Sequence, residues 1–351
     1  MELQENALFA LATYRSEHGD RVGLVMGSRL HDLHRSLSTY LEASPSPATG
    51  IAHERLVHVG SMRELLNSWF ELQPFLRSLA RFLKKRGETA DEGLPLNQAA
   101  LLAPVVKPGK MINAGLNFYD HAREMGIGIP SSGFRPNFFW KGDDHCIIGP
   151  SQEIRLSSRY VDWEAEPAVV IGRRSRNVKA SEAMAVVAGF TCHNDVTDRD
   201  LMLRADGSLD FLAGKARDTF GPLGPWIVPK EFVPYGRGLH IRCFLNGRVM
   251  QDTGTEQIIW GPERCIEYLS SIMTLDPGDV IALGTGAGVG WARGISVGQG
   301  EFPKIIEHLR KGGGTFLREG DRIAVEIDSI GRLENAVAEG EREGGSEPCC
   351  R

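Results

Sequence analysis

Short apolar runs punctuated by glycine recur along the chain from about residue 104 onward, and they limit the folds open to it more than any other feature. Examples are the runs at 168–172, 280–284 and 323–327. Runs of four to eight residues rich in Val and Ile and bounded by turn formers are typical of β-strands. Few long helical patterns interrupt them. The sequence therefore predicts an α+β chain whose larger domain, residues 104–335, is mainly sheet.

The first 103 residues have a different pattern. Residues 21–26, followed by Gly27 and Ser28, predict a strand and a turn. Apolar residues recur at helical spacing over 61–85, which predicts an amphipathic helix that is kinked or restarted at Pro74. The charged stretch 87–97 predicts a linker. We expect a small N-terminal α+β domain over 1–103 and, because residues 336–351 have almost nothing to bury, a disordered tail.

Composition argues against several classes of protein. The net charge of -5 provides no basic excess for binding a nucleic-acid backbone. No apolar run reaches the roughly 18 to 20 residues that a bilayer-spanning helix needs, and the first residues do not resemble a secretory signal. The six cysteines are scattered, without the spacing of a zinc site or a disulfide framework. We predict a cytoplasmic protein with reduced thiols and neither nucleic acid nor membrane as a partner.

Three acidic residues suggest a metal site. Glu164 and Glu166 precede the apolar run at 168–172, and on a strand they would face the same side about 7 Å apart. Two buried carboxylates repel each other, and a divalent cation with oxygen ligands, Mg²⁺ or Mn²⁺, would relieve that repulsion. Asp195 follows another apolar stretch and offers a third ligand. Taken alone, the Glu-x-Glu pattern favours two solvent-facing glutamates, and a lone aspartate is more often a turn or cap residue.

Several motifs occur together in a fixed order. They are residues 162–166 (DWEAE), 194–201 (NDVTDRDL), Gly214–Lys215 with 218–222 (DTFGP), and 284–290 (GTGAGVG). The set, with residues 115–126 and 321–335, closely resembles the catalytic domain of the fumarylacetoacetate hydrolase family. The resemblance covers about residues 105–335, whereas the N-terminal region is only loosely similar. It implies a mixed β-sandwich roll, a homodimer, and Mg²⁺ or possibly Mn²⁺ as cofactor, held by Glu164, Glu166 and Asp195.

The resemblance also points to the acid–base residues. Asn117 is a plausible N-cap of a short helix with Asp120 in its first turn, and His121 and Glu124 share a face of that helix. Spacing alone favours a solvent-exposed pair, but the family's His-x-x-Glu lid indicates a catalytic pair in which Glu124 orients His121. Lys215 resembles the family's active-site lysine, which would stabilise an oxyanion or donate a proton.

Four residues are predicted to contact the substrate: Arg199, Tyr119, Gln251 and Thr285. Arg199 could hold a carboxylate in a forked geometry, or it could form a structural ion pair with Asp198 or Asp200. The glycines of 284–290 would let backbone N–H groups approach an anionic substrate.

The predicted partner is a small 2-oxo acid. Our first hypothesis is a metal-dependent hydrolase that cleaves a carbon–carbon bond in a 2,4-dioxo acid of the acylpyruvate or fumarylpyruvate type, in the catabolism of aromatic or related compounds. The alternative is a lyase or isomerase that uses the same metal and enolate: an oxaloacetate-type decarboxylase, a 2-keto-3-deoxy sugar acid dehydratase, or a dienoate isomerase or hydratase. A non-catalytic relic is a third reading.

Several features depart from the family pattern, Asp198 and Pro167 among them. Met202 stands where many members have glutamine, and Gly286 replaces the usual proline. The segment 291–314 is longer than the usual connection, and we expect it to shape the substrate pocket.

Overall fold

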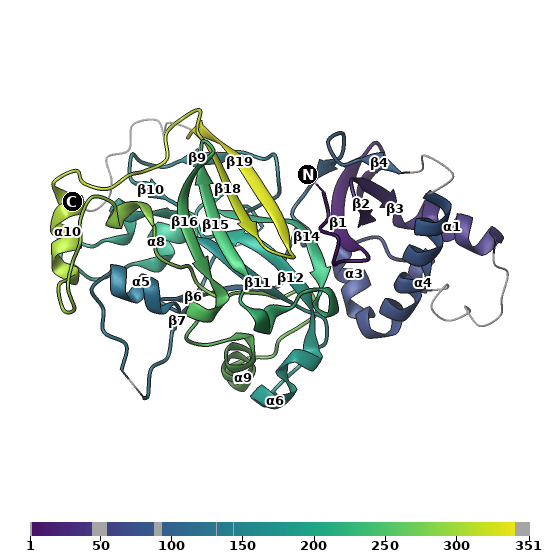
Figure 1. Ribbon diagram of the computed structural model, residues 1–351, viewed down its shortest axis with the longest axis horizontal. Coiled ribbons are helices and arrows are strands. Elements are labelled where there is room, and N and C mark those ends of the chain that lie inside the picture. The colour runs from purple at the N-terminus through teal and green to yellow at the C-terminus, as the bar shows by residue number, and fades with distance from the viewer. Residues whose placement is uncertain (1, 44–54, 88–92, 131, 143, 341–351) are drawn as a thin grey trace.

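The computed structural model describes residues 2–43, 55–87, 93–130, 132–142 and 144–340. Most of the strands lie in two sheets, one of twelve strands and one of five. The larger sheet runs through the whole molecule (Figure 1), in the order β4-β3-β2-β1-β14-β12-β11-β17-β6-β7, with β5 paired to β1 and β8 paired to β14. This arrangement of sheets and helices confirms the predicted α+β class.

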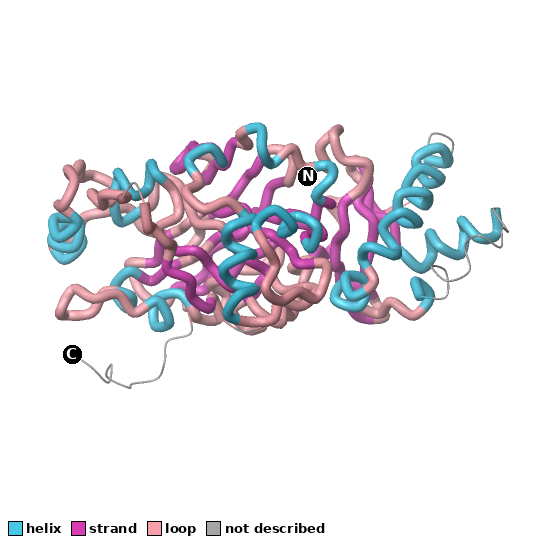
Figure 2. Tube along the Cα trace, turned by 90° about the horizontal axis from the view of Figure 1, so that it is seen from below, coloured by secondary structure: helices cyan, strands magenta, loops and turns pink. Residues whose placement is uncertain are grey.

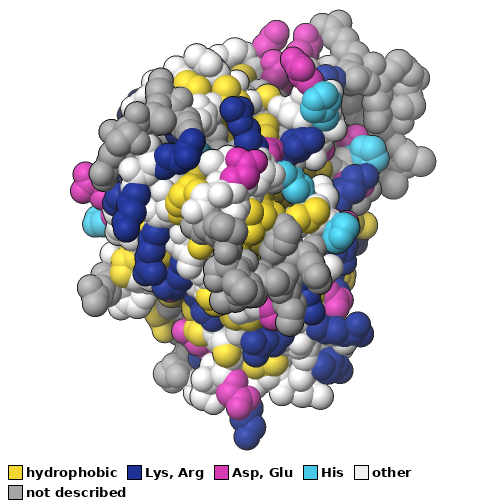
Figure 3. All heavy atoms as spheres, turned by 90° about the vertical axis from the view of Figure 1, so that its right-hand side faces the viewer, with side chains coloured by type: hydrophobic (Ala, Val, Ile, Leu, Met, Phe, Trp, Pro, Cys, Tyr) yellow, Lys and Arg dark blue, Asp and Glu magenta, His cyan; other side chains and the backbone are white. Residues whose placement is uncertain are grey.

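The N-terminal region is an antiparallel meander covered by helices. Its strands are β1 (Ala10–Ser16), β2 (Gly19–Met26), β3 (Arg29–Asp32), β4 (Leu94–Pro95) and β5 (Ala100–Leu101). Its helices, α1 (Leu33–Ala43), α3 (Met62–Asn67) and α4 (Trp69–Gly87), lie beside these strands at one end of the molecule (Figure 2). Strand β2 and the turn at 27–28 confirm the prediction for residues 21–28. Basic, acidic and histidine side chains lie side by side on the outer face of this region (Figure 3).

The helical segment breaks at Ser68, not at Pro74. The Ser61 side chain caps α3, and Ser68 ends this helix because its N–H bonds back to Leu65 O. The carbonyl of Ser68 then accepts the N–H groups of Glu71 and Leu72 as α4 begins. Pro74 lies inside α4, in its second turn, so the predicted restart at this proline is wrong.

The N-terminal region shares both a sheet and a core with the rest of the chain. Strand β1 pairs with β14 (Gly221–Pro229), with Leu11 opposite Ile227. The side chains of Trp69 and Leu76 pack in one apolar cluster with Val170 and Ile227. The described part of residues 2–103 therefore packs directly on the larger region. Of the predicted linker, residues 88–92 lie outside the described residues, and Leu94–Pro95 forms β4.

Two packed sheets form the larger region. Besides β14, the long sheet contains β6 (Met111–Gly115), β7 (Asn137–Trp140), β8 (Ile147–Ile148), β11 (Ala165–Ile171), β12 (Val187–Asn194) and β17 (Val280–Ala282). The second sheet contains, in order, β16 (Arg248–Gly254), β15 (His240–Leu245), β18 (Arg322–Ile327), β19 (Gly331–Glu339) and β9 (Ile154–Leu156). Buried side chains from both sheets, including Phe190, Trp226, Ile241 and Val325, share one core. Strands β11, β17 and β18 confirm the strands predicted from the apolar runs.

Short helices and a small ribbon complete this region. The ribbon pairs β10 (Val161–Asp162) with β13 (Thr197–Asp198). The α-helices are α5 (Tyr119–Glu124), α6 (Ala180–Ala183), α7 (Arg199–Met202), α8 (Phe211–Lys215), α9 (Pro262–Ile272) and α10 (Phe302–Arg310). The 3-10 helices are η2 (Met184–Val186), η3 (Lys230–Phe232), η4 (Tyr235–Arg237), η5 (Thr255–Gln257) and η6 (Gly290–Ala292). None of the described helices has the length and apolar content that crossing a bilayer requires.

The last strand runs further than expected. Strand β19 continues to Glu339, where it pairs in parallel with β9, so the predicted start of the tail at residue 336 is too early. Side chains alternate between buried and half-buried along this strand because Leu333, Asn335 and Val337 face the core. The remainder of the predicted tail, residues 341–351, lies outside the described residues.

Stability is expected to fall above about pH 9. Cys192, Cys243 and Cys265 are free and buried, and burial raises the pKa of each thiol. Above the ordinary thiol pKa the unfolded chain loses these protons and the folded chain keeps them, so unfolding is favoured by about 1.4 kcal/mol per pH unit and thiol. Denaturant unfolding with reductant at increasing pH measures this, and Cys192→Ala should flatten the dependence. Equal stability at pH 8 and pH 10 would contradict it.

Candidate active site

Three carboxylates converge where β11 and β12 lie side by side. The antiparallel register pairs Ala165 with Asn194 and Glu166 with His193, which brings the start of β11 next to the end of β12. Glu164, Glu166 and Asp195 offer oxygen atoms that all lie within 4.8 Å of one another. The three residues are 7%, 2% and 1% exposed. The solvent-facing alternative for the two glutamates therefore does not hold.

Buried cations surround these carboxylates. Lys215 Nζ lies 2.9 Å from Glu164 Oε2 and 2.6 Å from Asp195 Oδ2. Lys141 Nζ lies 2.6 Å from Asp195 Oδ1 and donates to Val196 O. Arg199 donates from Nη2 to Glu164 Oε1 at 2.7 Å. Each of the three cations is at most 2% exposed, so these pairs offset the cost of burying the acids.

The three acids differ in pKa because the cations are unevenly distributed. Burial raises the pKa of each carboxyl, but for Asp195 the charges of Lys141 and Lys215 outweigh it and the pKa is lowered. The pKa of Glu164 is lowered because Lys215 and Arg199 outweigh its burial. The pKa of Glu166 is raised well above its usual value by burial and by the charges of Asp195 and Glu164. Glu166 is the carboxyl that would gain most from a nearby cation.

The donor set fits a hard divalent cation. A carboxylate has about four lone-pair positions, so oxygens that already accept one hydrogen bond can still bind a metal. All three converging groups are carboxylates, which suits Mg²⁺ or Mn²⁺ better than Zn²⁺. Glu166 also accepts the N–H of Gly284 at 2.9 Å, which fixes the orientation of its side chain.

Helix α5 carries the predicted acid–base pair. His121 Nδ1 lies 3.1 Å from Glu124 Oε2, and Glu124 Oε1 accepts the N–H of Gly288 at 2.7 Å. His121 is 7% exposed, so this is not the solvent-exposed pair that spacing alone favours. His121 lies close enough to Glu164 for the two side chains to interact electrostatically. Because Nδ1 faces Glu124, Nε2 is the atom left for proton transfer.

Asn117 does not cap this helix, which corrects the prediction. The residue before α5 is Phe118, and no side chain caps the helix there. The Asn117 amide donates to Trp260 O and Leu283 O, and its oxygen accepts from Trp260 N. Asn117 is fully buried, and its hydrogen bonds connect two loops to the residue before α5. Asp120 lies in the first turn, as predicted, and accepts the N–H of His121.

Arg199 pairs with neither of its predicted partners. Its Nε donates to Asp162 Oδ2 at 2.8 Å, and the Trp291 ring lies 4.5 Å from its guanidinium. Asp198 instead caps α7, where it accepts the N–H groups of Asp200 and Leu201. The pairing of Arg199 with Asp198 or Asp200 is therefore wrong. The guanidinium is already held by Asp162 and Glu164.

The other predicted substrate contacts also have protein partners. Gln251 accepts the N–H of Ala165 and donates to Thr285 Oγ1 and Gly286 O. Thr285 Oγ1 in turn donates to Ala165 O. These bonds attach β16 and the 284–290 segment to β11. Tyr119 is 47% exposed at the start of α5.

The departures from the family pattern fit their surroundings. Met202 is 1% exposed and packs in an apolar cluster with Met125, Trp291 and Leu309, to which the 291–314 segment contributes. A Cβ at Gly286 would lie 2.3 Å from Thr253 Cγ2, which excludes proline while Thr253 donates to Asp120. The long segment therefore packs as an apolar layer, with α10, against Met202 and the end of α5.

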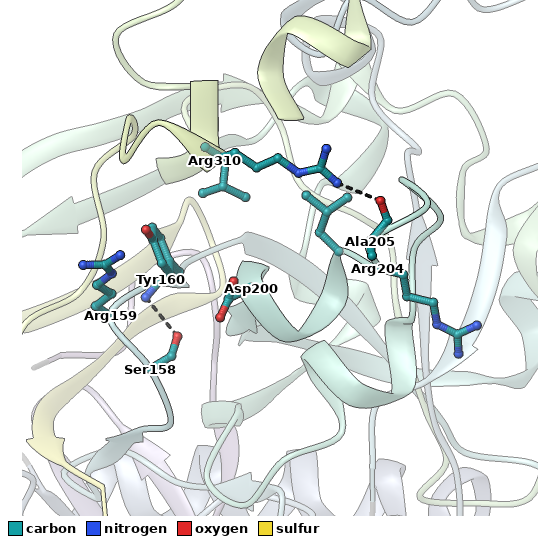
Figure 4. Close-up of a pocket in the computed structure, with 9 residues that line it drawn as sticks. Ser158, Arg159, Tyr160, Asp200, Arg204, Ala205 and Arg310 are labelled. Carbon is teal, nitrogen blue, oxygen red and sulfur yellow. Dashed lines mark hydrogen bonds between the residues drawn. The ribbon is translucent and has the colours of Figure 1, made fainter. Parts of the chain in front are cut away.

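A separate cavity of about 470 Å³ lies outside α7 (Figure 4). It does not coincide with the carboxylate site; its lining includes Ser158, Arg159, Tyr160, Asp200, Arg204, Ala205 and Arg310. Arg310 donates to Ala205 O and Arg204 pairs with Asp210. The guanidinium groups of Arg159 and Arg204 point away from its centre, so they do not converge on an anion.

Comparison with known proteins agrees with this geometry. A family model described as fumarylacetoacetate (FAA) hydrolase C-terminal matches residues 110–338, well over half of the chain. The chain belongs to the fumarylacetoacetate hydrolase family. This confirms the resemblance drawn from the motifs, and with it a family of enzymes.

Relatives within the fumarylacetoacetate hydrolase family cover 70% to 86% of this chain. Rat "Oxaloacetate tautomerase Fahd2a, mitochondrial" is 34% identical over 330 residues, covering 86% of this chain and 97% of the relative. Bovine "Oxaloacetate tautomerase FAHD2A, mitochondrial" is 40% identical over 246 residues, 70% of this chain and 71% of the relative.

Solved structures of fumarylacetoacetate hydrolase relatives share the fold. The fumarylacetoacetate hydrolase of psychrophilic Exiguobacterium antarcticum has a TM-score of 0.67 at 25% identity, covering 94% of this chain and 99% of that one. Maleylpyruvate hydrolase from Sphingobium sp. SYK-6, in complex with manganese (II) ion and pyruvate, has a TM-score of 0.64 at 25% identity, covering 94% and 100%. The predicted family fold is confirmed.

Lys141 is a site residue that was not singled out from the sequence. It directly follows the apolar residues 138–140 of a strand, and a charged residue at the end of such a run was the one sign in the sequence that its side chain is buried.

Replacing Lys141 with methionine leaves one Asp195 oxygen without its cation, so we expect a loss of about 3 kcal/mol in unfolding free energy. Urea unfolding measures it. Lys107→Ala removes an exposed ion pair with Asp144 and should leave stability nearly unchanged; equal effects of the two variants would contradict the argument.

Proposed function

We propose that this protein is a metal-dependent tautomerase of 2-oxo acids that carry a second carboxylate, the class to which oxaloacetate belongs. The observation that carries the proposal is the buried His121–Glu124 pair beside three carboxylates that suit a divalent cation. Relatives that are 34–40% identical are named oxaloacetate tautomerases. The proposal departs from the hydrolase hypothesis and stays with the metal-and-enolate chemistry of its alternatives.

His121 acts as the base. With Nδ1–H donated to Glu124, the Nε2 lone pair can take a proton from C3 of the bound 2-oxo acid. Glu124 stabilises the resulting imidazolium, and the N–H of Gly288 keeps Glu124 in place. Return of the proton to C3 completes the reverse direction.

Lys215 supplies the second proton. Its ammonium lies between Glu164 and Asp195, beside the point where the carboxylates converge, so its charge offsets the enolate. Transfer of a proton from Lys215 to the C2 oxygen, as His121 takes one from C3, converts the keto acid into the enol. His121 then releases its proton to solvent and Lys215 regains one, so the protein returns to its starting state. A divalent cation held by Glu164, Glu166 and Asp195 would supply further positive charge beside the 2-oxo carboxylate and so favour the enolate.

Hydrolysis of an acylpyruvate is the second candidate, as the sequence predicted. It is favoured by the likeness to maleylpyruvate hydrolase and by the same His–Glu pair. The tautomerase is placed first because the relatives named oxaloacetate tautomerases are 34–40% identical to this chain, whereas the maleylpyruvate hydrolase is 25% identical.

A substrate panel tests the proposal. The protein would be loaded with Mg²⁺ or Mn²⁺ and given oxaloacetate, with the enol followed by ultraviolet absorbance, and in parallel acylpyruvates, fumarylpyruvate and sugar acids. We expect faster interconversion of the keto and enol forms of oxaloacetate, and loss of that rate with chelator. Cleavage of an acylpyruvate without any effect on oxaloacetate would overturn the tautomerase in favour of the hydrolase.

The homodimer, the role in aromatic catabolism and the cytoplasmic location stay predictions. The relatives above are named mitochondrial.

A further inference from the structure

Three backbone N–H groups of one glycine-rich segment each bond a different acidic residue. Gly284 N donates to Glu166 Oε2 at 2.9 Å. Gly288 N donates to Glu124 Oε1 at 2.7 Å. Gly290 N donates to Asp162 Oδ1 at 2.6 Å. The donors come from seven consecutive residues, whereas the acceptors come from α5, β10 and β11.

Each acceptor serves a different part of the site. Glu166 belongs to the carboxylate triad, and Glu124 orients His121. Asp162 holds Arg199 at 2.8 Å, and Arg199 holds Glu164 at 2.7 Å. One short segment therefore bonds to Glu166 directly and to Glu164 through Asp162 and Arg199. It also bonds to Glu124 of the acid–base pair.

We propose that residues 284–290 are a positioning loop that fixes the metal ligands and the His121–Glu124 pair relative to each other. The inference rests on the roles proposed above for those residues. It replaces the expectation that these N–H groups approach the substrate, because all three are already bonded to protein carboxylates. Its glycines are positioning residues and do not touch the reacting atoms.

The loop needs glycine at the donor positions. Gly284 and Gly288 have φ angles of +90° and +105°, which other residues rarely adopt. A Cβ at Gly288 would lie 2.3 Å from Met250 O, and one at Gly290 would lie 2.0 Å from Thr315 O. A side chain at either place would push its N–H away from the carboxylate it holds.

The loop is itself anchored to the neighbouring strands. Gln251 on β16 donates to Thr285 Oγ1 at 2.8 Å and to Gly286 O at 2.9 Å, and accepts from Ala165 N on β11. Thr285 Oγ1 donates to Ala165 O at 3.0 Å. Gln251 and Thr285, which the sequence predicted to contact substrate, thus also hold the loop in place.

Two matched glycine variants separate the functions of the loop. Gly284→Ala should weaken Mn²⁺ binding about 10- to 100-fold, because it disturbs a group that orients a ligand. Gly288→Ala should bind Mn²⁺ as the original protein does, while kcat falls about 10- to 100-fold and the acidic limb of the pH–rate profile moves to lower pH. Calorimetry or electron paramagnetic resonance measures Mn²⁺ binding, and Ala287→Ser, between the donors, is the control for a change in the loop itself.

The outcomes distinguish the loop from the proposed function. Equal loss of Mn²⁺ affinity and turnover in both variants would overturn the positioning loop. Failure of the unmodified protein to bind Mn²⁺ or to act on any 2-oxo acid would overturn the proposed function instead. In that case, or if the glycine variants do not fold, amide hydrogen exchange tests the positioning loop. Glu124→Ala should speed exchange at residues 287–290 and His121→Ala should not; unchanged exchange in Glu124→Ala would refute the inference.

Discussion

Replacing Glu166 with glutamine is expected to abolish Mn²⁺ binding and metal-dependent turnover while leaving the fold as stable as before. Because burial and the charges of Asp195 and Glu164 raise the pKa of Glu166 well above its usual value, the metal-free fold favours the uncharged form of this side chain. Glutamine has the same shape and no charge, and it can still accept the N–H of Gly284. The substitution therefore removes only the ability to become an anionic ligand.

Asp195→Asn is the matched comparison. The pKa of Asp195 is strongly lowered because Lys141 and Lys215 outweigh its burial, so it is charged in the folded protein. Its removal leaves two buried ammonium groups short of an anion, and we expect the unfolding free energy to fall by about 3–5 kcal/mol. Urea unfolding with chelator and Mn²⁺ titration separate the two effects. Equal destabilisation by both variants, or Mn²⁺ binding by Glu166→Gln at the original affinity, would contradict the argument.

His121→Ala is expected to lower kcat about 10²- to 10⁴-fold, the usual contribution of a positioned general base. Mn²⁺ affinity should not change, because His121 is not one of the three converging ligands. Arg123→Ala changes an exposed residue of the same helix and should keep the original rate. Steady-state kinetics with the keto acid, at saturating Mn²⁺, measure the difference. A His121→Ala protein that turns over at full rate would remove His121 from the mechanism.

The sequence predicted the acidic triad because its signals are local. Glu164 and Glu166 stand at the head of an apolar strand, Asp195 stands at the end of the next, and pairing of those strands brings them together. The position of His121 and Glu124 on one short helix was equally local. The strands at 168–171 and 323–327 were predictable for the same reason, since each is a short apolar run bounded by turn formers.

Contacts between distant segments could not be predicted in this way. Arg199 is 37 residues from Asp162, and they meet because β10 pairs with β13. Local reasoning offered only the neighbours Asp198 and Asp200 as partners. Asn117 resembled a helix cap, but its side chain is taken by loops 143 and 166 residues away. Lys141 looked like an ordinary charged residue until the fold buried it against Asp195.

Because β1 pairs with β14, a fragment limited to the residues matched by the family model should not be stable. A recombinant fragment starting near residue 104 would leave the Ile227 edge of β14 without its hydrogen-bonding neighbour and would uncover Val170 and other apolar side chains now beneath α4. Open strand edges of this kind recruit other chains. Such a fragment should therefore collect in inclusion bodies, and tags are better attached at the ends of the 351-residue chain.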